Sequence, residues 1–366
     1  MTKETAFYVS LVISLLFSIT MVNGIHARVT TNHVDSLSAT TNQGLEVTAT
    51  TNKQQYCAYE TVQVYGNLTL AGVSVTDGLV GLQITSPPQN ETLITRTLST
   101  GNPPSETPYV FIEYVVPCDQ NGDPRFSFQR GTLALFKTSV VNLDIEPRDA
   151  LMTVNIYYSE NVPFGHASLQ ATISAQSNPS FIIGVPIPED ATLGTATVYA
   201  DAYTDWPRLA GTPYCSEVNS TFQITSTTSL TSQAAQNPLP TIQQTDPTVN
   251  YNSTFRLARN TPTGNYTVYV SSRYQGESAS NSTTFEAYRL GDLGGGVPPQ
   301  FLLFDGAVDG KDLALFLQCF KGTAPPEAMY LGDLGGGVPP QFFQFDGKVD
   351  GKDLALFLQC YKGIGP

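Results

Sequence analysis

Short alternating segments dominate the pattern of hydrophobic and polar residues through the middle of the chain. In "YETVQVYGNLTLAG" (59–72), apolar residues repeat at every second position on either side of a central Gly-Asn pair. This period of two is typical of a half-buried β-strand. Similar segments recur from about residue 45 to residue 226, with Gly and Pro clusters between them. The pattern predicts a mainly β chain built from antiparallel sandwiches.

The alternating segments group into modules. We predict a first sandwich over residues 45–130 and a second over residues 131–226. Residues 227–245 are rich in Ser, Thr, Gln and Pro and have little apolar periodicity, which predicts a linker. Residues 246–288 then form a partial third module, because they are too few for the seven strands of a complete sandwich.

An internal echo supports this partial module. "GTATVYADAY" (194–203) matches "GNYTVYVSSRY" (264–274), and each is followed by a similar segment, "NSTFQI" or "NSTTFEA". The echo predicts the end of a further module whose upstream half is missing. Either this is a truncated module that packs against a neighbour, which we favour, or it is a small sheet with one poorly covered face.

The modules resemble the immunoglobulin-like domains of prokaryotic surface proteins over about residues 45–226. The Cys–Trp–Cys signature of antibody domains is missing, and the single tryptophan, Trp206, lies in "YTDWPR". We expect Trp206 to cover the edge of a core, since aromatic side chains bury large areas. A carbohydrate-stacking platform is the alternative.

The N-terminus predicts secretion. Lys3 precedes a run of seventeen uncharged, mostly apolar residues, 6–22, and small residues follow. This is the pattern of a signal peptide, which we assign to residues 1–27. An uncleaved anchor is the alternative. A Ser/Thr-rich spacer over residues 28–44 follows. The mature chain is expected to be extracellular, and attachment to a cell surface stays open.

Composition agrees with an extracellular address. The chain has 31 acidic and 18 basic residues, a net charge of −13, which argues against nucleic acid or anionic membrane as a partner. Six Asn-x-Ser/Thr sequons are glycan acceptors on a secreted surface. They are Asn67, Asn90, Asn219, Asn252, Asn265 and Asn281.

The five cysteines are unevenly placed. Cys57 and Cys118 flank the first predicted sandwich, and an oxidising compartment permits disulfides, so we predict that these two are bridged. Sequence alone does not assign Cys215, Cys319 and Cys360.

Catalytic patterns are scarce. The sequence has no Cys–His pair, HExxH helix, GxSxG motif or phosphate-binding glycine loop. Glu189-Asp190 is expected to be a solvated turn, as is "CDQNGDPRF" (118–126), which has the first half of a calcium-loop spacing but lacks its glycine and final carboxylate. We therefore predict that the chain is not an enzyme.

The most specific signal is a terminal duplication. Residues 291–322 and 332–363 align without gaps and are identical at 28 of 32 positions. In each copy, apolar residues at i, i+3, i+4 and i+7 predict an amphipathic helix. They are Leu313, Phe316, Leu317 and Phe320, and then Leu354, Phe357, Leu358 and Tyr361.

A calcium-loop spacing precedes each helix. With Asp305 as the fifth loop position, the sixth is a glycine, the seventh offers a carbonyl, and the ninth and twelfth are Asp309 and Asp312. These are the oxygen donors and the turn that such a loop needs. Asp346, Asp350 and Asp353 repeat the arrangement.

At these residues the chain resembles a dockerin, over about residues 289–366. The resemblance implies two calcium loops and helices packed about a pseudo-twofold axis. It also implies binding to cohesin domains of other extracellular proteins, and the same layout occurs at the C-termini of secreted archaeal proteins. Dockerins recognise partners largely through loop positions ten and eleven, which are Gly310-Lys311 and Gly351-Lys352 here.

One departure concerns the first ligand. The first and third positions fall on Phe301 and Leu303 in one copy, and on Phe342 and Gln344 in the other. A Gly-Asp pair opens each copy, with nine extra residues before the fifth position. We interpret this as an expanded loop that returns Asp292 or Asp333 to the first ligand position.

The sequence therefore predicts a non-catalytic secreted or cell-surface protein with an adhesive or spacer arm of immunoglobulin-like modules. Its terminal module would bind two Ca²⁺ ions and dock to a cohesin-like protein, with carbohydrate as a further possible partner. Stapling of a small fold by calcium, without docking, stays open. So do a structural subunit of a surface layer or filament and an accessory part of a carbohydrate-degrading complex. The predicted ligands are Asp292, Asp305, Asp309, Asp312, Asp333, Asp346, Asp350 and Asp353.

Overall fold

The computed structural model describes seven stretches of the chain, all within the compact unit Thr41–Pro366. They are residues 44–104, 107–226, 250–258, 261–294, 307–325, 328–335 and 347–362. The predicted signal peptide (1–27), the spacer up to residue 43 and the linker (227–245) lie outside these residues. The chain is mainly β, as predicted. Within the described stretches, no helix combines the length and the apolar character that crossing a membrane requires.

One sandwich is built from a continuous segment, residues 110–225. Its three-stranded sheet has the order β14-β11-β9 and its five-stranded sheet the order β10-β16-β15-β12-β13. Neighbours are antiparallel except for β10 and β16, which are parallel. The strands are β9 (Val110–Cys118), β10 (Ser127–Gln129), β11 (Leu133–Asn142), β12 (Arg148–Tyr158), β13 (Pro163–Ile173), β14 (Ser180–Pro186), β15 (Gly194–Tyr203) and β16 (Val218–Thr225). We call this the continuous sandwich.

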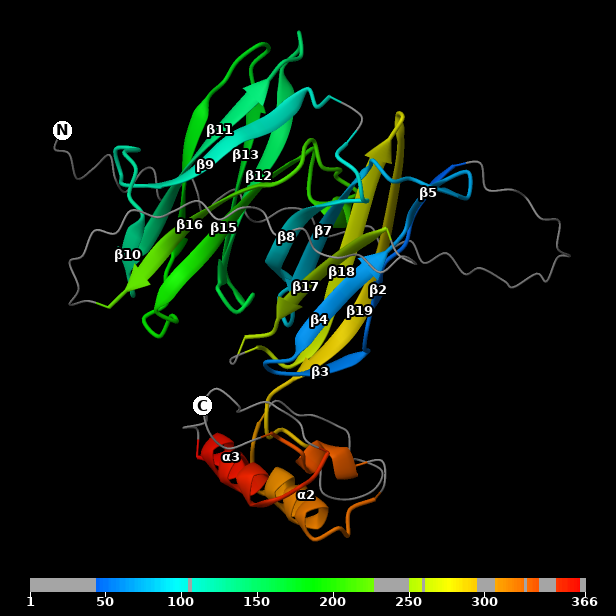
Figure 1. Cartoon of the computed structure of the whole chain (residues 1–366), viewed down its shortest axis with the longest axis vertical. Coiled ribbons are helices and arrows are strands. Elements are labelled where there is room, and N and C mark those ends of the chain that lie inside the picture. Colours follow the sequence, from blue (N-terminus) through cyan, green and yellow to red (C-terminus); the bar gives the residue numbers. More distant parts are fainter. Residues whose placement is uncertain are drawn as a thin grey trace, which may run out of the picture. The chain divides into compact units, whose positions relative to one another are not determined.

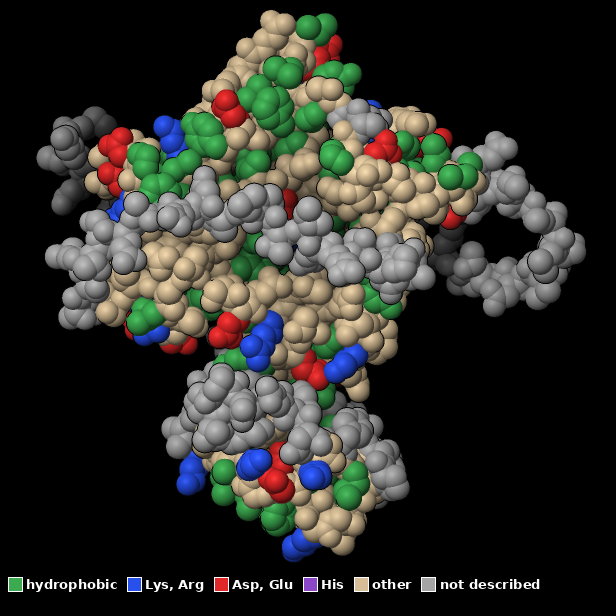
Figure 2. Space-filling view, in the orientation of Figure 1, with side chains coloured by type: hydrophobic (Ala, Val, Ile, Leu, Met, Phe, Trp, Pro, Cys, Tyr) green, Lys and Arg blue, Asp and Glu red, His purple; other side chains and the backbone are tan. Residues whose placement is uncertain are grey.

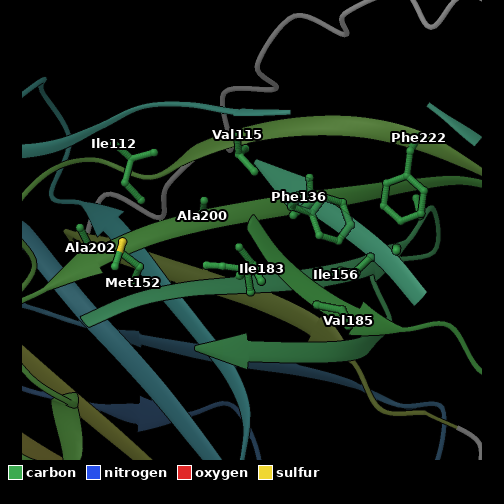
Figure 3. Packing of buried hydrophobic residues seen from close by; sticks show 14 of the residues in the cluster. Ile112, Val115, Phe136, Met152, Ile156, Ile183, Val185, Ala200, Ala202 and Phe222 are labelled. Carbon is green, nitrogen blue, oxygen red and sulfur yellow. The ribbon is translucent and has the colours of Figure 1, made fainter. Parts of the chain in front are cut away.

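Its core forms where the inward faces of the two sheets meet. Figure 3 shows Phe136 and Ile183 from the three-stranded sheet among Ile156, Ala200 and Phe222 from the five-stranded sheet. Phe222 and Phe136 lie with ring centroids 5.5 Å apart. Alternation along each strand supplies these inward side chains, so the period of two in the sequence produces this core.

The other sandwich is built from two segments that are distant in the sequence. In Figure 1 its blue to teal strands, from residues 45–99, lie beside its yellow strands, from residues 251–288. The sheet orders are β17-β4-β2, β3-β19-β18-β7-β8 and a small β1-β5-β6. The strands are β1 (Leu45–Val47), β2 (Thr50–Thr51), β3 (Gln55–Cys57), β4 (Thr61–Gly66), β5 (Leu68–Leu70), β6 (Val73–Ser74), β7 (Leu79–Ser86), β8 (Glu91–Ser99), β17 (Tyr251–Arg256), β18 (Gly264–Tyr274) and β19 (Glu277–Tyr288). We call this the split sandwich.

The strand pairing corrects the predicted module boundaries. Residues 246–288 are not a separate module, because β17 pairs with β4 and β18 pairs with β7. They complete the sandwich that begins at Leu45. Strand β9, predicted within residues 45–130, pairs instead with β11 of the continuous sandwich. The continuous sandwich is therefore an insertion between β8 and β17 of the split one.

A partly buried polar network joins the two sandwiches. The guanidinium of Arg96 on β8 binds both carboxylate oxygens of Glu217, at 2.6 and 2.7 Å, and lies 3.8 Å from the ring centroid of Tyr199. Beside them Asp201 is fully buried. Burial raises the pKa of Asp201 well above its usual value, and the charge of Glu217 raises it further, while Arg96 opposes both.

The terminal repeat folds as two short helices, α2 (Gly310–Phe320) and α3 (Gly351–Tyr361), with the 3₁₀ turn η2 (Met329–Gly332) between them. A further 3₁₀ turn, η1 (Pro207–Leu209), follows Trp206 in the continuous sandwich. Phe316 and Phe357 stack across the helix pair, with centroids 4.7 Å apart. Each helix thus buries part of its apolar face against the other.

The buried helix face differs from the predicted one. In α2 the buried side chains are Asp312, Leu315, Phe316 and Cys319, and Phe320 is 40% exposed. In α3 they are Asp353, Leu356 and Phe357. The segment "LALFLQC" is apolar on nearly every side, so its periodicity fits either face, and the tertiary contacts select the one that includes the aspartate.

The predicted Cys57–Cys118 disulfide is wrong. Both cysteines are buried, but they lie in different sandwiches and are not bonded to each other. Cys57 ends β3 of the split sandwich and joins the core of the terminal module, whereas Cys118 ends β9 of the continuous sandwich. The prediction assumed that both belong to one sandwich, and the insertion removes that assumption.

Candidate functional site

The first copy of the repeat gathers its backbone around Asp312. One carboxylate oxygen, Oδ1, accepts hydrogen bonds from the N–H groups of Leu293 (2.7 Å) and Gly294 (3.1 Å). The other, Oδ2, accepts from Asp309 N–H at 2.6 Å, and Asp309 in turn caps α2 by accepting from Lys311 N–H. This capping box satisfies the orphan donors at the helix start. The bonds from Leu293 and Gly294 also hold the opening segment of the repeat against Asp312, the twelfth loop position.

The second copy has the same geometry. Asp353 Oδ1 accepts from Leu334 N–H (2.8 Å) and Gly335 N–H (2.9 Å), and its Oδ2 accepts from Asp350 N–H (2.7 Å). Asp350 caps α3 through Lys352 N–H. Because the bonded atoms agree pair by pair, the arrangement belongs to the repeat and not to one copy.

The opening aspartate returns to the loop glycine. Asp333 Oδ2 accepts a 2.7 Å hydrogen bond from the N–H of Gly347, the sixth loop position, fourteen residues away. This contact agrees with the expanded loop that we inferred from the nine extra residues. In the first copy, Asp292 is fully buried and directly precedes the two residues that bind Asp312. The first and twelfth positions therefore converge in both copies.

Burial sets the electrostatics of this site. Asp292, Asp312 and Asp353 are 0%, 2% and 3% exposed, in a chain whose charged side chains are otherwise mostly at the surface. Burial raises the pKa of Asp312, while hydrogen bonds from the N–H groups of Asp309, Leu293 and Gly294 lower it. Backbone N–H groups thus orient the carboxylates of Asp312 and Asp353, and a bound cation would favour their ionised form.

The remaining predicted residues are placed only in part. Asp305 and Asp346 lie outside the described residues, and Asp309 and Asp350 are half-buried helix caps. Within the described part of the chain no group of three or more His, Cys, Asp or Glu side chains is positioned to hold a metal. The predicted partner-binding residues are exposed at the two helix starts. They are Gly310, Lys311, Gly351 and Lys352.

The repeated cysteines have a packing role that the sequence did not reveal. A Cβ added at Gly332 would lie 2.6 Å from the Cβ of Cys319, and one at Gly291 would lie 3.0 Å from the Cβ of Cys360. Each helix cysteine therefore packs over the opening glycine of the other copy. The repetition of both Gly and Cys in the two copies was the available signal.

The structure also places the other residues that the sequence analysis considered. Trp206 is half-buried, with its ring centroid 5.9 Å from that of His166 and the Arg208 guanidinium 5.5 Å away. Burial lowers the pKa of His166 to about 4, so its imidazole is neutral at pH 7. Asp119 accepts hydrogen bonds from the N–H groups of Asn121 and Asp123, which closes a turn as predicted. Glu189 and Asp190 are exposed in a turn.

Charge is distributed unevenly over the face seen in Figure 2. Acidic and basic side chains are scattered over the sandwiches, and a group of both signs lies over the part that holds α2 and α3.

Four of the sequon asparagines are exposed, and the side-chain nitrogen of Asn281 also donates to Val47 O. The exposed four are Asn90, Asn219, Asn265 and Asn281.

No family model matches the chain, and no curated protein matches it. Among solved structures, a CARDB domain from Pyrococcus furiosus in complex with di-metal ions has a TM-score of 0.23 and 10% identity, over 32% of this chain and 94% of that one. The C-terminal domain of wzt has a TM-score of 0.27 and 12% identity, over 35% and 86%. A beta-glucosidase from Listeria innocua has a TM-score of 0.23 and 6% identity, over 37% and only 17%. At such scores these likenesses carry no argument about function.

Proposed function

We propose that this chain is a secreted or cell-surface, non-catalytic protein whose terminal dockerin-like module binds calcium and docks to a cohesin-like protein. The two sandwiches would serve as its adhesive or spacer arm. The observation that carries the proposal is the convergence of the first and twelfth loop positions in both copies, through hydrogen bonds that span eighteen and nineteen residues.

The donor set fits calcium. Ca²⁺ takes six to eight oxygen ligands, from carboxylates, carbonyls and water. Four aspartates in each copy would hold it, with the carbonyl at the seventh position, Ala307 or Lys348. These aspartates are Asp292, Asp305, Asp309 and Asp312, and then Asp333, Asp346, Asp350 and Asp353. The bound ion would offset the repulsion between carboxylates that the fold holds close together.

The backbone contacts limit how Asp312 and Asp353 would contribute. A carboxylate has about four acceptor positions, and three backbone N–H groups already use three of them. The fourth, on Oδ2, would be available to a cation. We therefore expect each residue to supply one oxygen while it also caps its helix.

The exposed helix starts support the docking role. Gly310-Lys311 and Gly351-Lys352 are at the surface, next to the proposed ions, and the two copies present them in the same local geometry. Calcium loss would release the opening segment from the helix start and so remove the docking surface.

A capture experiment tests docking. The mature chain is immobilised and exposed to secreted proteins of the same source, in calcium or in a chelator. We expect a cohesin-like protein to be retained only in calcium, and the double variant Lys311→Glu/Lys352→Glu to lose it. Lys321 and Lys362, the exposed lysines at the other helix ends, are the matched control pair. Calcium-dependent polymers of the chain itself would favour a layer or filament subunit instead.

A further inference from the structure

The two repeat cysteines occupy equivalent positions but have different surroundings. Cys319 is 2% exposed, and its thiol donates to the carbonyl of Ala328 at 3.3 Å, inside the terminal module. Cys360 is half-buried and packs on Gly291, in the segment that leaves β19. The pseudo-twofold relation would give both thiols the same role, so the difference reflects what lies beside Cys360.

Cys57 of the split sandwich lies beside the same segment. It ends β3, which runs parallel to β19 and places Cys57 opposite Tyr288, and Ala58 N–H donates to Tyr288 O at 2.9 Å. Three residues after Tyr288 comes Gly291. Cys57 and Gly291 line one cavity of about 260 Å³, together with Tyr288 and Leu331.

Three observations therefore bring Cys57 and Cys360 together. Both belong to one apolar cluster, in which Cys57 is buried and Cys360 packs against the buried residues. Gly291 contacts Cys360 and shares a cavity with Cys57. The charge of Cys360 also raises the pKa of Cys57, in addition to the larger effect of burial.

We propose that Cys57 and Cys360 form a disulfide that ties the terminal module to the split sandwich. The co-reactant is an oxidising disulfide, such as oxidised glutathione. The more exposed thiol, Cys360, would lose its proton and attack that disulfide, which releases one glutathione thiolate and leaves a mixed disulfide. Cys57 then displaces the second glutathione, so two thiols are oxidised and one disulfide is reduced to two thiols.

The bond would link the third strand of the chain to its last helix. The terminal module then stays on the sandwich when calcium is absent, and docking acts on a covalently fixed module. The inference uses the oxidising compartment implied by the proposed function. Purified chain in a glutathione buffer tests the pairing by itself, whatever the outcome with calcium.

Peptide mapping of the full chain provides the test. After equilibration in a glutathione redox buffer, free thiols are blocked with N-ethylmaleimide and the chain is digested without reductant. We expect one linked peptide pair that contains Cys57 and Cys360 and that separates on reduction. Recovery of both cysteines with the maleimide, or a link of Cys57 to another cysteine, would overturn the proposal.

Two serine variants serve as a matched pair. In Cys360→Ser, Cys57 should become fully reactive to N-ethylmaleimide once the chain is denatured. In Cys319→Ser, which changes the same position of the other copy, the Cys57–Cys360 link should persist. Equal reactivity of Cys57 in the two variants would contradict the assignment, and mapping of the unaltered chain decides the question if either variant fails to fold.

Discussion

The two sandwiches have the same strand topology but different chain continuity. In each, a three-stranded sheet (β2-β4-β17 or β9-β11-β14) faces a five-stranded sheet whose outer strand, β3 or β10, is parallel to its neighbour, β19 or β16. The continuous sandwich uses one segment, whereas the split sandwich is interrupted after β8. The topology therefore depends on which strands pair and not on an unbroken chain.

The position of the interruption explains why the fold tolerates it. It falls between β8, the outer strand of one sheet, and β17, the outer strand of the other. A connection at that place runs from sheet to sheet at the surface, where insertions cost little. The buried contacts of Arg96 and Thr95 on β8 with Glu217 and Asn155 then fix the inserted sandwich to its host.

The largest effect should follow from removal of the returning strands. A chain that ends at Ser226 lacks β18, a central strand of the five-stranded sheet, together with eight buried core residues. We expect the split sandwich to unfold while the continuous one stays folded. The stabilising free energy lost with a central strand and these core residues exceeds a typical folding free energy of about 5–15 kcal/mol. The lost core residues are Tyr251, Phe255, Leu257, Tyr266, Val268, Val270, Phe285 and Ala287.

Hydrogen exchange measures this effect strand by strand. Amides of β4 and β7 should lose protection in the truncated chain, while those of β12 and β15 keep it. A chain that ends at Arg289 keeps both sandwiches and is the control. Unchanged protection of β7 in the chain that ends at Ser226 would show that this strand does not need its partner β18.

A smaller effect should follow from breaking the ion pair of Arg96 and Glu217, whose side chains are 13% and 18% exposed. Arg96→Gln leaves the mostly buried Glu217 carboxylate without its charged partner, which typically costs about 1–3 kcal/mol. Glu160→Gln is the matched control, because Glu160 also pairs across the two sandwiches, with Arg256, but is 59% exposed. The control should cost less than about 1 kcal/mol. Equal losses in urea denaturation would mean that burial does not distinguish the two pairs.

The smallest effect concerns the pH dependence of stability. Because burial raises the pKa of Asp201, the folded state holds this proton more tightly than the unfolded chain. The resulting stability is complete below the unfolded pKa of about 3.9 and is lost as the pH rises toward the folded pKa. Asp201→Asn removes the group, so the free energy of unfolding of the variant should rise relative to that of the native protein as the pH increases above about 4. Parallel stability curves of the two proteins would contradict a protonated Asp201.

Local patterns in the sequence predicted the strands, but the pairing between distant segments was beyond them. The echo between residues 194–203 and 264–274 correctly identified equivalent strands, β15 and β18, and the strands that follow each. It could not show that the missing half of that module lies before residue 100. Tyr251 pairs with Gly66, and an alternating strand carries no mark of a partner so far away.

The sequence likewise indicated only part of the candidate site. Carboxylate spacing indicated the loop, and the extra residues indicated that Asp333 returns to it, which agrees with the contact to Gly347. The sequence did not predict that backbone N–H groups of Leu334 and Gly335 bind Asp353, because those contacts depend on the path of the expanded loop. It also misplaced Cys57, whose neighbour is set by the parallel pairing of β3 and β19.

Calcium titration of the full chain tests the central claim most directly. Isothermal titration calorimetry of the metal-free protein should give two Ca²⁺ ions per chain. Asp333→Asn should leave one ion, and Asp119→Asn, in a turn of the continuous sandwich with a similar spacing, should leave two. A native protein that binds no calcium, or an Asp333→Asn variant that still binds two ions, would contradict the account.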